Sequence, residues 1–304
     1  MSDHDENEAI ARIGIIGAGQ MGGGIAQVCA VAGYEVSLQD VTTERVRQAL
    51  EGITARLNRL VEKQKLTPAA SAEALKRIRT GTGLELFSGY DLVIEAAVEN
   101  KHIKREIFEK LCPVLQDKAL ICTNTSSISV TALAAHTDRP ERFMGMHFMN
   151  PVPVMSLVEL IRALTTSDAT YSAIKGVVAK LGKTGVTSQD YPAFIVNRVL
   201  LPMINEAIFA LHEGIGDIAS IDTAMKLGAN MPMGPLELGD FIGLDVCLNI
   251  MRVLYEGTAD SKYRPCPLLV KCVEAGWLGR KSGCGFYNYK ERPPTPNYRI
   301  LRVA

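Results

Sequence analysis

The sequence predicts an α/β fold, a doubly wound parallel sheet, followed by an all-helical domain. Short apolar runs alternate with helical segments over residues 12–190, the pattern of a sheet covered by helices. A glycine-rich turn at 17–22 joins the first apolar run to the first helix. Beyond Asp190 the strand pattern ends and long helical segments follow. We therefore expect two domains, 1–190 and 191–304.

The strands expected in the first domain are short apolar runs. These runs lie at 12–16, 35–39, 91–96, 119–123, 143–147 and 157–161, with one more near Val186. Helices are expected between them at 25–32, 101–115 and 167–181. Strands that alternate with helices in this way form one sheet packed between helices.

An unusually long connection follows the second apolar run. About 50 residues separate Asp40 from the run that begins at Asp91, more than an ordinary crossover needs. Apolar residues at helical spacing predict a first helix, and Thr67 with Pro68 is typical of the start of a second. We expect a helical hairpin, inserted in the first domain at about 43–79.

The second domain is expected to be helical throughout. Its helical segments are 194–213, 217–227, 235–255 and 267–275. Its helices are strongly apolar, which suggests that this domain has surface to hide against another chain.

The overall charge limits the partners. Lys plus Arg and Asp plus Glu both number 33, so the chain has no net charge at pH 7. This balance argues against a nucleic-acid partner and against a general attraction to anionic membranes. No apolar run reaches the length of a membrane span.

The cysteines indicate the compartment. There are seven, an odd number, and their spacing matches no metal site. Most lie among apolar residues, as reduced core cysteines do, so we expect no metal and a reducing compartment. The acidic, polar N-terminus at 1–8 is not a secretory signal. The cytoplasm fits, and the mitochondrial matrix, after removal of a transit peptide, stays an alternative.

The glycine-rich turn reads GAGQMG, a G-x-G-x-x-G motif between a strand and a helix. Its first glycine allows the tight turn, its second lets a pyrophosphate approach the backbone, and its third lets the helix pack closely. The N-terminus of the helix attracts the phosphate charge. Glycines that merely make a turn are the alternative. The residues expected to bind a dinucleotide are Gly17, Gly19, Gln20, Met21 and Gly22.

Asp40 ends the second apolar run, about 20 residues beyond the glycines. A carboxylate there holds the adenosine ribose hydroxyls and repels the additional phosphate of NADP. Arg45 is close in sequence and would act in the opposite sense. The acid at the end of the strand favours NAD as the cofactor.

A polar cluster, residues 124–127 (NTSS), directly follows the run at 119–123. Polar side chains at the C-terminal end of a strand lie where ligands bind in an open parallel sheet. Helix capping and turn formation explain Asn and Ser there equally well.

Residues 147–159 hold a histidine, a proline-rich turn and a carboxylate. Pro151 and Pro153 exclude a helix here, but a loop and a returning strand would bring His147 and Glu159 together. Glu159 lies among apolar residues, where an unpaired carboxylate would be costly, so it needs a partner. A histidine with an unperturbed pKa of about 6.5 moves a hydroxyl proton in either direction. A satisfied core histidine in an ordinary strand pair is the alternative.

Seven segments together resemble the L-3-hydroxyacyl-CoA dehydrogenases, most closely the short, single-function 3-hydroxybutyryl-CoA type. They are GAGQMG (17–22), VIEAAVEN (93–100), NTSS (124–127), HFMNPVPVMSLVE (147–159), FIVNR (194–198), PMGP (232–235) and GRKSG (279–283). They span nearly the whole chain. The resemblance implies a Rossmann-type NAD domain with a helical hairpin and a helical domain that binds substrate and forms a homodimer.

The resemblance also implies roles by position. His147 would be the acid/base and Glu159 its partner. Ser126 and Asn197 would hydrogen-bond the 3-oxygen and the thioester region of the substrate. The residues that would contact NAD or the ternary complex are Asp40, Glu99, Lys104, Asn124 and Asn150.

Arg56 and Arg59 lie on the first helix of the expected hairpin. A solvated charged face is the simplest interpretation of such residues. The functional alternative is a clamp for a phosphorylated group. The resemblance implies that the hairpin helps to hold the nucleotide end of coenzyme A.

We therefore predict an NAD-dependent enzyme of fatty acid metabolism that interconverts an L-3-hydroxyacyl-CoA and its 3-oxoacyl-CoA. One alternative is a sugar-acid dehydrogenase of the L-gulonate type, which shares the nucleotide domain and the dyad. The other is a catalytically silent NADH-binding protein. The unbroken segment 150–155 and the basic hairpin favour an acyl-CoA. The presence of all four expected catalytic residues argues against a silent protein.

Overall fold

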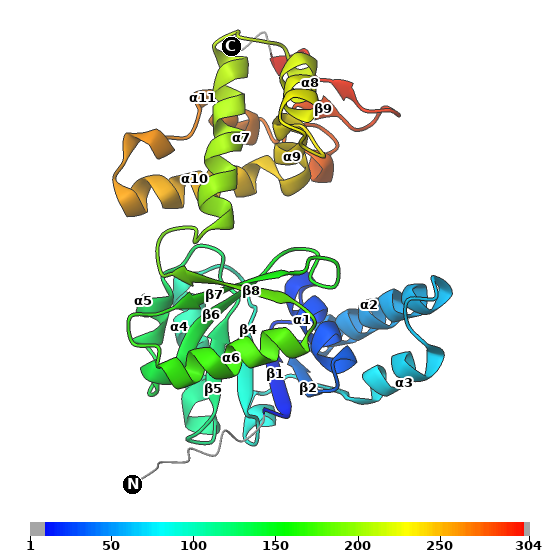
Figure 1. Cartoon of the computed structure of the whole chain (residues 1–304), viewed down its shortest axis with the longest axis vertical. Helices are drawn as coiled ribbons and strands as arrows, with labels where there is room; N and C mark the ends of the chain where they lie inside the picture. Colours follow the sequence, from blue (N-terminus) through cyan, green and yellow to red (C-terminus); the bar gives the residue numbers. More distant parts are fainter. Residues whose placement is uncertain (1–9, 301–304) are drawn as a thin grey trace. The chain divides into compact units, whose positions relative to one another are not determined.

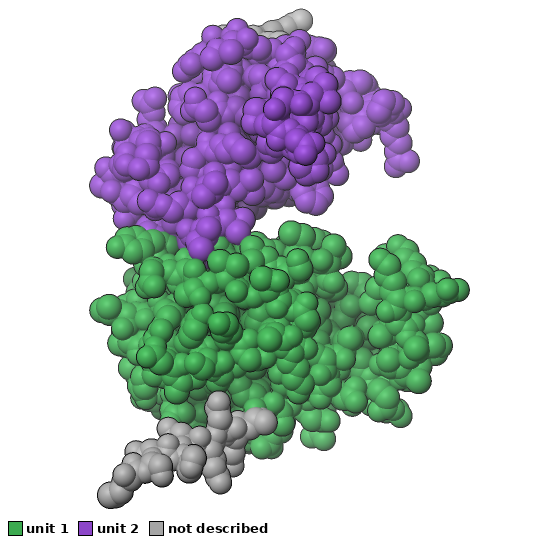
Figure 2. Space-filling view, in the orientation of Figure 1, with its two compact units in different colours: residues 1–191 green, residues 192–304 purple. Residues whose placement is uncertain are grey.

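The computed structural model describes residues 10–300 and divides the chain into two compact units, 1–191 and 192–304 (Figure 2). The first unit contains an eight-stranded sheet with helices, and the second is built from helices and one two-stranded ribbon. The α/β class predicted from the sequence, with a helical part after it, is therefore confirmed.

The sheet of the first unit has the strand order β3-β2-β1-β4-β5-β6-β7-β8. Its strands are β1 Arg12–Ile16, β2 Glu35–Gln39, β3 Ile78–Gly81, β4 Leu92–Glu95, β5 Leu120–Thr123, β6 Phe143–Phe148, β7 Leu157–Arg162 and β8 Thr184–Gln189. Neighbouring strands are parallel except for β6 and β7, which are antiparallel. The order reverses direction beside β1, between β1 and β4, where an open α/β sheet binds its ligand.

Helices cover both faces of this sheet. They are α1 Gln20–Val31, α2 Thr43–Glu62, α3 Pro68–Lys76, α4 Lys101–Leu111, α5 Val130–Ala134 and α6 Asp168–Lys180. Figure 1 shows α1 and α6 on the near face, with α4 and α5 behind the strands. The strands β1, β4, β5 and β6 are almost wholly buried because both of their faces are covered.

The expected helical hairpin is present as α2 and α3. Thr42 caps α2 by accepting a hydrogen bond from the Arg45 N–H, and Thr67 caps α3 in the same way. The sequence missed the strand that follows. β3 pairs with β2 in parallel, so the two helices form the crossover to an edge strand. Only Ile78 of β3 is buried, which leaves no apolar pattern to read.

The second unit contains α7 Val196–His212, α8 Ile218–Gly228, α9 Pro235–Ile242, α10 Leu244–Thr258 and α11 Pro267–Glu274. A ribbon of β9 Tyr287–Asn288 and β10 Thr295–Pro296 follows. The single helix expected at 235–255 is wrong, because the chain breaks into α9 and α10 at Gly243. This residue has φ of +105°, a conformation that a right-handed helix cannot contain.

Among residues 10–300, no helix is long and apolar enough to cross a membrane.

Candidate active site

The glycine turn between β1 and α1 forms one end of a cavity of about 1100 Å³. Gly17 has φ of +98°, and a Cβ added there would lie 2.6 Å from the Ala96 carbonyl oxygen. A Cβ on Gly22 would overlap the Gly17 carbonyl oxygen, whereas one on Gly19 would meet nothing within 4 Å. Gly17 and Gly22 therefore allow close packing, and Gly19 leaves open space at the N-terminus of α1. A phosphate fits there.

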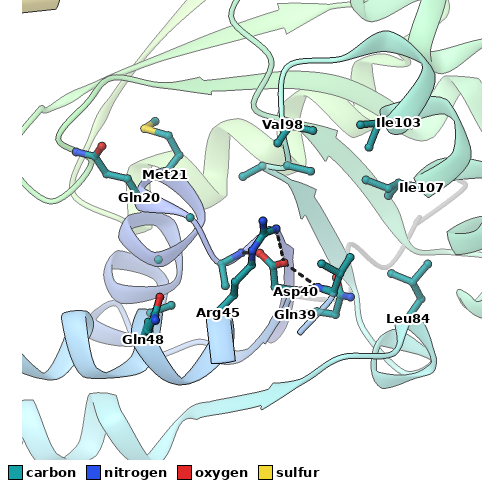
Figure 3. A pocket seen from close by; sticks show the side chains of 18 of the residues that line it. Gln20, Met21, Gln39, Asp40, Arg45, Gln48, Leu84, Val98, Ile103 and Ile107 are labelled. Carbon is teal, nitrogen blue, oxygen red and sulfur yellow. Dashed lines mark hydrogen bonds and ion pairs between the residues drawn. The ribbon is translucent and has the colours of Figure 1, made fainter. Parts of the chain in front are cut away.

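Asp40 links the end of β2 to this turn. Its Oδ2 accepts a hydrogen bond from the Ala18 N–H at 2.7 Å, and its Oδ1 accepts one from the Val41 N–H at 2.7 Å. Arg45 donates to the same Oδ1 at 3.3 Å. Figure 3 shows Asp40 and Arg45 joined at the cavity wall. Because a carboxylate offers about four acceptor positions, Asp40 retains capacity for a ribose hydroxyl.

The opposite wall of the cavity is apolar. Val98, Ile103 and Ile107 line it, together with Leu84. Figure 3 shows these side chains on the far side of the cavity from Gln20 and Met21. An apolar wall facing a phosphate-binding turn and an acid fits a dinucleotide, whose base is flat and apolar and whose linker is charged.

Glu99 holds the loop that follows β5. Its Oε1 accepts hydrogen bonds from the Thr125 hydroxyl at 2.6 Å, the Ser126 N–H at 2.9 Å and the Ser127 N–H at 3.1 Å. Burial alone would raise the pKa of Glu99. The Lys104 ammonium, 3.4 Å from Oε2, and the hydrogen bonds outweigh burial and lower that pKa. Glu99 therefore stays ionised and fixes the serine loop.

Lys104 lies beneath this loop with 1% of its side chain exposed. Its Nζ donates to Glu95 Oε1 at 2.6 Å and to Oε2 at 2.8 Å. Glu95 is fully buried and also accepts from the Thr123 hydroxyl at 2.7 Å. The expected contact of Lys104 with the cofactor stays a prediction. In this structure Lys104 neutralises two carboxylates.

His147 and Glu159 are directly opposite one another in the antiparallel pair β6–β7. His147 Nδ1 lies 2.6 Å from Glu159 Oε2. Glu159 is fully buried, and His147 is 7% exposed. The turn at 151–156 returns the chain as the prolines suggested, so the structure brings the two groups together. A carboxylate on Nδ1 orients the ring and fixes its tautomer.

Two asparagines lie beside this pair. Asn124, after β5, accepts the Phe148 N–H at 2.8 Å through its Oδ1. Asn150, after β6, accepts from the Gln20 Nε2 at 3.0 Å. These bonds tie the ends of β5, β6 and β1 together at one edge of the sheet. Their roles toward NAD stay predictions.

The remaining expected substrate residues belong to α2 and to the second unit, and Arg56 of α2 lines the cavity. Asn197 is in the first turn of α7, in the second unit, and is half-buried. Arg56 faces α1, donating to Gln27 Oε1 at 2.7 Å and to the Gly23 carbonyl at 3.4 Å. Arg59 is exposed. Roles for these residues toward coenzyme A stay predictions.

Sequence reasoning missed Glu95 and Thr123. The available signal was Glu95 itself, a carboxylate inside an apolar run, which needs a partner as Glu159 does. Among residues 10–300, no group of three or more His, Cys, Asp or Glu side chains could hold a metal ion.

Known proteins match this chain over most of its length. Residues 12–191 match the family model for the 3-hydroxyacyl-CoA dehydrogenase NAD binding domain, and residues 194–289 match that for the C-terminal domain. A 3-hydroxybutyryl-CoA dehydrogenase of Bradyrhizobium diazoefficiens is 60% identical over 94% of this chain and 98% of its own length. A probable 3-hydroxybutyryl-CoA dehydrogenase of Bacillus subtilis is 51% identical over 93% of this chain and 99% of its own length.

A solved structure resembles most of the chain as well. The crystal structure of (S)-3-hydroxybutyryl-CoA dehydrogenase from Ralstonia eutropha has a TM-score of 0.91 and 49% sequence identity. The match covers 93% of this chain and 100% of that one.

Proposed function

Because this chain belongs to the 3-hydroxyacyl-CoA dehydrogenase family, we propose that His147 is its acid/base and Glu159 its orienting partner. The reaction is the NAD-dependent oxidation of a 3-hydroxyacyl-CoA to a 3-oxoacyl-CoA. The family and activity predicted from the sequence are thereby confirmed. The observation that carries the residue assignment is the 2.6 Å contact between His147 Nδ1 and the fully buried Glu159.

The glycine turn and Asp40 would hold NAD, which would supply the acceptor for the hydride that leaves C3 of the substrate. The chain itself must take the hydroxyl proton. We propose that His147 Nε2 accepts it, because Glu159 occupies Nδ1 and stabilises the imidazolium that forms. In the reverse direction the same nitrogen returns the proton to the 3-oxo oxygen. Ser126, held by Glu99, and Asn197 would bind the substrate oxygens.

The substrate we propose is the L-isomer of a short 3-hydroxyacyl-CoA such as 3-hydroxybutyryl-CoA. The names of the relatives in Bradyrhizobium diazoefficiens and Bacillus subtilis support a four-carbon acyl group. Steady-state kinetics with NADH and 3-oxoacyl-CoA substrates of increasing length test this. The highest kcat/KM is expected for acetoacetyl-CoA. A preference for long chains would contradict the proposed substrate, and turnover of gulonate with NAD would favour the sugar-acid alternative.

We also propose that the unit 192–304 binds substrate and forms a homodimer. Its exposed apolar side chains support this, since monomers seldom expose many of them. They include Val199, Ile215, Leu227 and Phe241. Light scattering on the purified chain is expected to give twice its mass of 33.0 kDa. A single-chain mass at micromolar concentration would contradict the dimer.

A cytoplasmic location and a role in fatty acid metabolism complete the proposal. The seven cysteines lie in the described part of the chain as free thiols, and six of them are buried. This supports a reducing compartment, which the mitochondrial matrix also provides. Fractionation of the source cells with an antibody distinguishes these locations from a secreted one.

A further inference from the structure

The turn between β6 and β7, residues 151–156, carries Asn150 at its start. Its backbone closes on itself, because the N–H groups of Val154 and Met155 donate to the Pro151 carbonyl at 2.9 and 3.0 Å. Val154 is 76% exposed and Met155 40% exposed, so the outer side of the turn has little packing. Groups outside the turn must therefore fix its position.

Lys183, between α6 and β8, is one such group. Its Nζ donates to the Val152 carbonyl at 2.7 Å and to the Met155 carbonyl at 2.6 Å. The next residue, Thr184, donates its N–H to the Ser156 carbonyl at 2.7 Å. No carboxylate of residues 10–300 forms an ion pair with this ammonium. Burial lowers the pKa of Lys183, and the nearby Cys29 thiol acts against that shift. The hydrogen bonds of the Lys183 ammonium are therefore directed to the two carbonyl groups of the turn.

Helix α1 holds the turn from the other side. A Cβ added to Gly24 would lie 2.9 Å from Val152 Cβ, and Val152 is 2% exposed. Gln20, in the first turn of α1, lines the cofactor cavity and donates to Asn150 Oδ1 at 3.0 Å. The turn is therefore seated between α1 and Lys183, with Asn150 against the rim of the cavity.

We propose that Lys183 is a positioning residue for the dehydrogenase reaction. Its two bonds to the turn fix the place of Asn150 beside Gln20, and thereby the site of the cofactor. The inference rests on the proposed function, because Asn150 matters to catalysis only if the cavity holds NAD. A shift of about 1 Å at a catalytic site can lower the rate by roughly a hundredfold.

The test uses Lys183→Met, which keeps the length of the side chain and removes its donors. We expect kcat/KM for NADH with acetoacetyl-CoA to fall at least about tenfold. Lys183→Arg keeps two donors and should recover part of that loss. The matched control is Lys180→Met, on the same helix end, where the ammonium lies 4.0 Å from the Tyr34 ring centroid. The control should stay within about twofold of the wild type, as surface substitutions usually do.

A double-mutant cycle with Asn150→Ala shows whether the effect of Lys183 on the reaction is transmitted through Asn150. If Lys183 acts through Asn150, then Lys183→Met should change kcat/KM for NADH much less in the Asn150→Ala background. Equal effects in both backgrounds, or a lower Tm with unchanged kcat/KM, would overturn the proposal. NADH binding followed by its own fluorescence gives a readout that needs no turnover. If wild-type protein binds NADH without reducing acetoacetyl-CoA, the proposed function fails. The NADH affinity of Lys183→Met then still tests whether Lys183 positions the cofactor site.

Discussion

The two units hold their buried carboxylates in different ways. In the sheet unit, Glu95 faces the Lys104 ammonium at 2.6 Å and Glu159 faces His147 at the same distance. In the helical unit, Asp222 and Asp240 are each 1% exposed. Their hydrogen-bond donors are backbone N–H groups and tyrosine hydroxyls.

The pKa values follow this difference. The pKa of Glu99, beside Lys104, is lowered although burial opposes it. Burial raises the pKa of Asp240 to about 6, and its neutral donors offset that only in part. Asp240 fastens the segment at 286–289. Changes to the charged pairs should therefore leave a buried charge uncompensated, whereas changes at Asp240 should alter how stability depends on pH.

The largest effect is expected at His147. His147→Gln removes the group that takes the proton, so turnover of acetoacetyl-CoA should fall by at least about a thousandfold. The affinity for NADH should change little, because the nucleotide cavity is built from other residues. His136→Gln provides a matched histidine control and should keep wild-type rates. Near-normal turnover by His147→Gln would remove His147 as the acid/base.

Glu159→Gln should have the next largest effect. The amide can still touch Nδ1 but no longer stabilises an imidazolium, so kcat should fall roughly ten- to ten-thousandfold. Tm and the affinity for NADH separate this role from a structural one, because a structural role would lower both. An unchanged rate would contradict the dyad.

This dyad was readable from the sequence because all its constraints are local: two short runs, two prolines and one acid that needs a partner. The partner of Glu95 could not be predicted from the sequence, because Lys104 reaches Glu95 only after α4 packs against the sheet. β3 was missed because an edge strand with one buried residue has no pattern. The break at Gly243 depends on a backbone angle. Local patterns predicted most strands and helices and the contact between His147 and Glu159. The partner of Glu95, β3 and the break at Gly243 depend on tertiary structure.

Lys104→Met breaks the buried ion pair of the sheet unit and leaves Glu95 charged without its cation. Loss of one partner of a buried pair costs about 3–5 kcal/mol, so the free energy of unfolding in urea should fall by that amount. Glu95→Gln in the same chain should recover much of the loss. Lys76→Met, which breaks the exposed pair with Glu73, should leave stability nearly unchanged. A Lys104→Met protein as stable as wild type would refute this contrast.

The contributions of Asp240 and Glu99 to the free energy of unfolding should depend on pH in opposite directions. The pKa of Asp240 rises from 3.8 in the unfolded chain to about 6. Its protonation stabilises the fold below pH 3.8, and this contribution is lost as the pH rises through 6. The loss is about 3 kcal/mol. The lowered pKa of Glu99 instead gives stability that is present above 4.5 and lost as the pH falls through the folded pKa.

Asp240→Asn isolates the effect of this aspartate. The variant cannot titrate at this position, so its free energy of unfolding minus that of the wild type should grow from pH 4 to pH 7. Urea unfolding at four pH values measures this difference. A constant difference would show that Asp240 is ionised throughout.

The smallest effect is expected at Asp40, where a carboxylate meets a largely exposed cation. Arg45 is 62% exposed, so their pair should add little stability, but it sits where the adenosine ribose would bind. Asp40→Ala removes the charge that repels a 2′-phosphate and leaves Arg45 to attract it. The ratio of kcat/KM for NADPH to that for NADH should rise by about tenfold or more. Tm should fall as well, because the Ala18 and Val41 N–H groups lose their acceptor. Asp40→Ala with Arg45→Ala should lose most of that gain, because no cation then remains at that position. If the double variant used NADPH as well as the single one, Arg45 would have no part in the selectivity, and the acid alone would decide it.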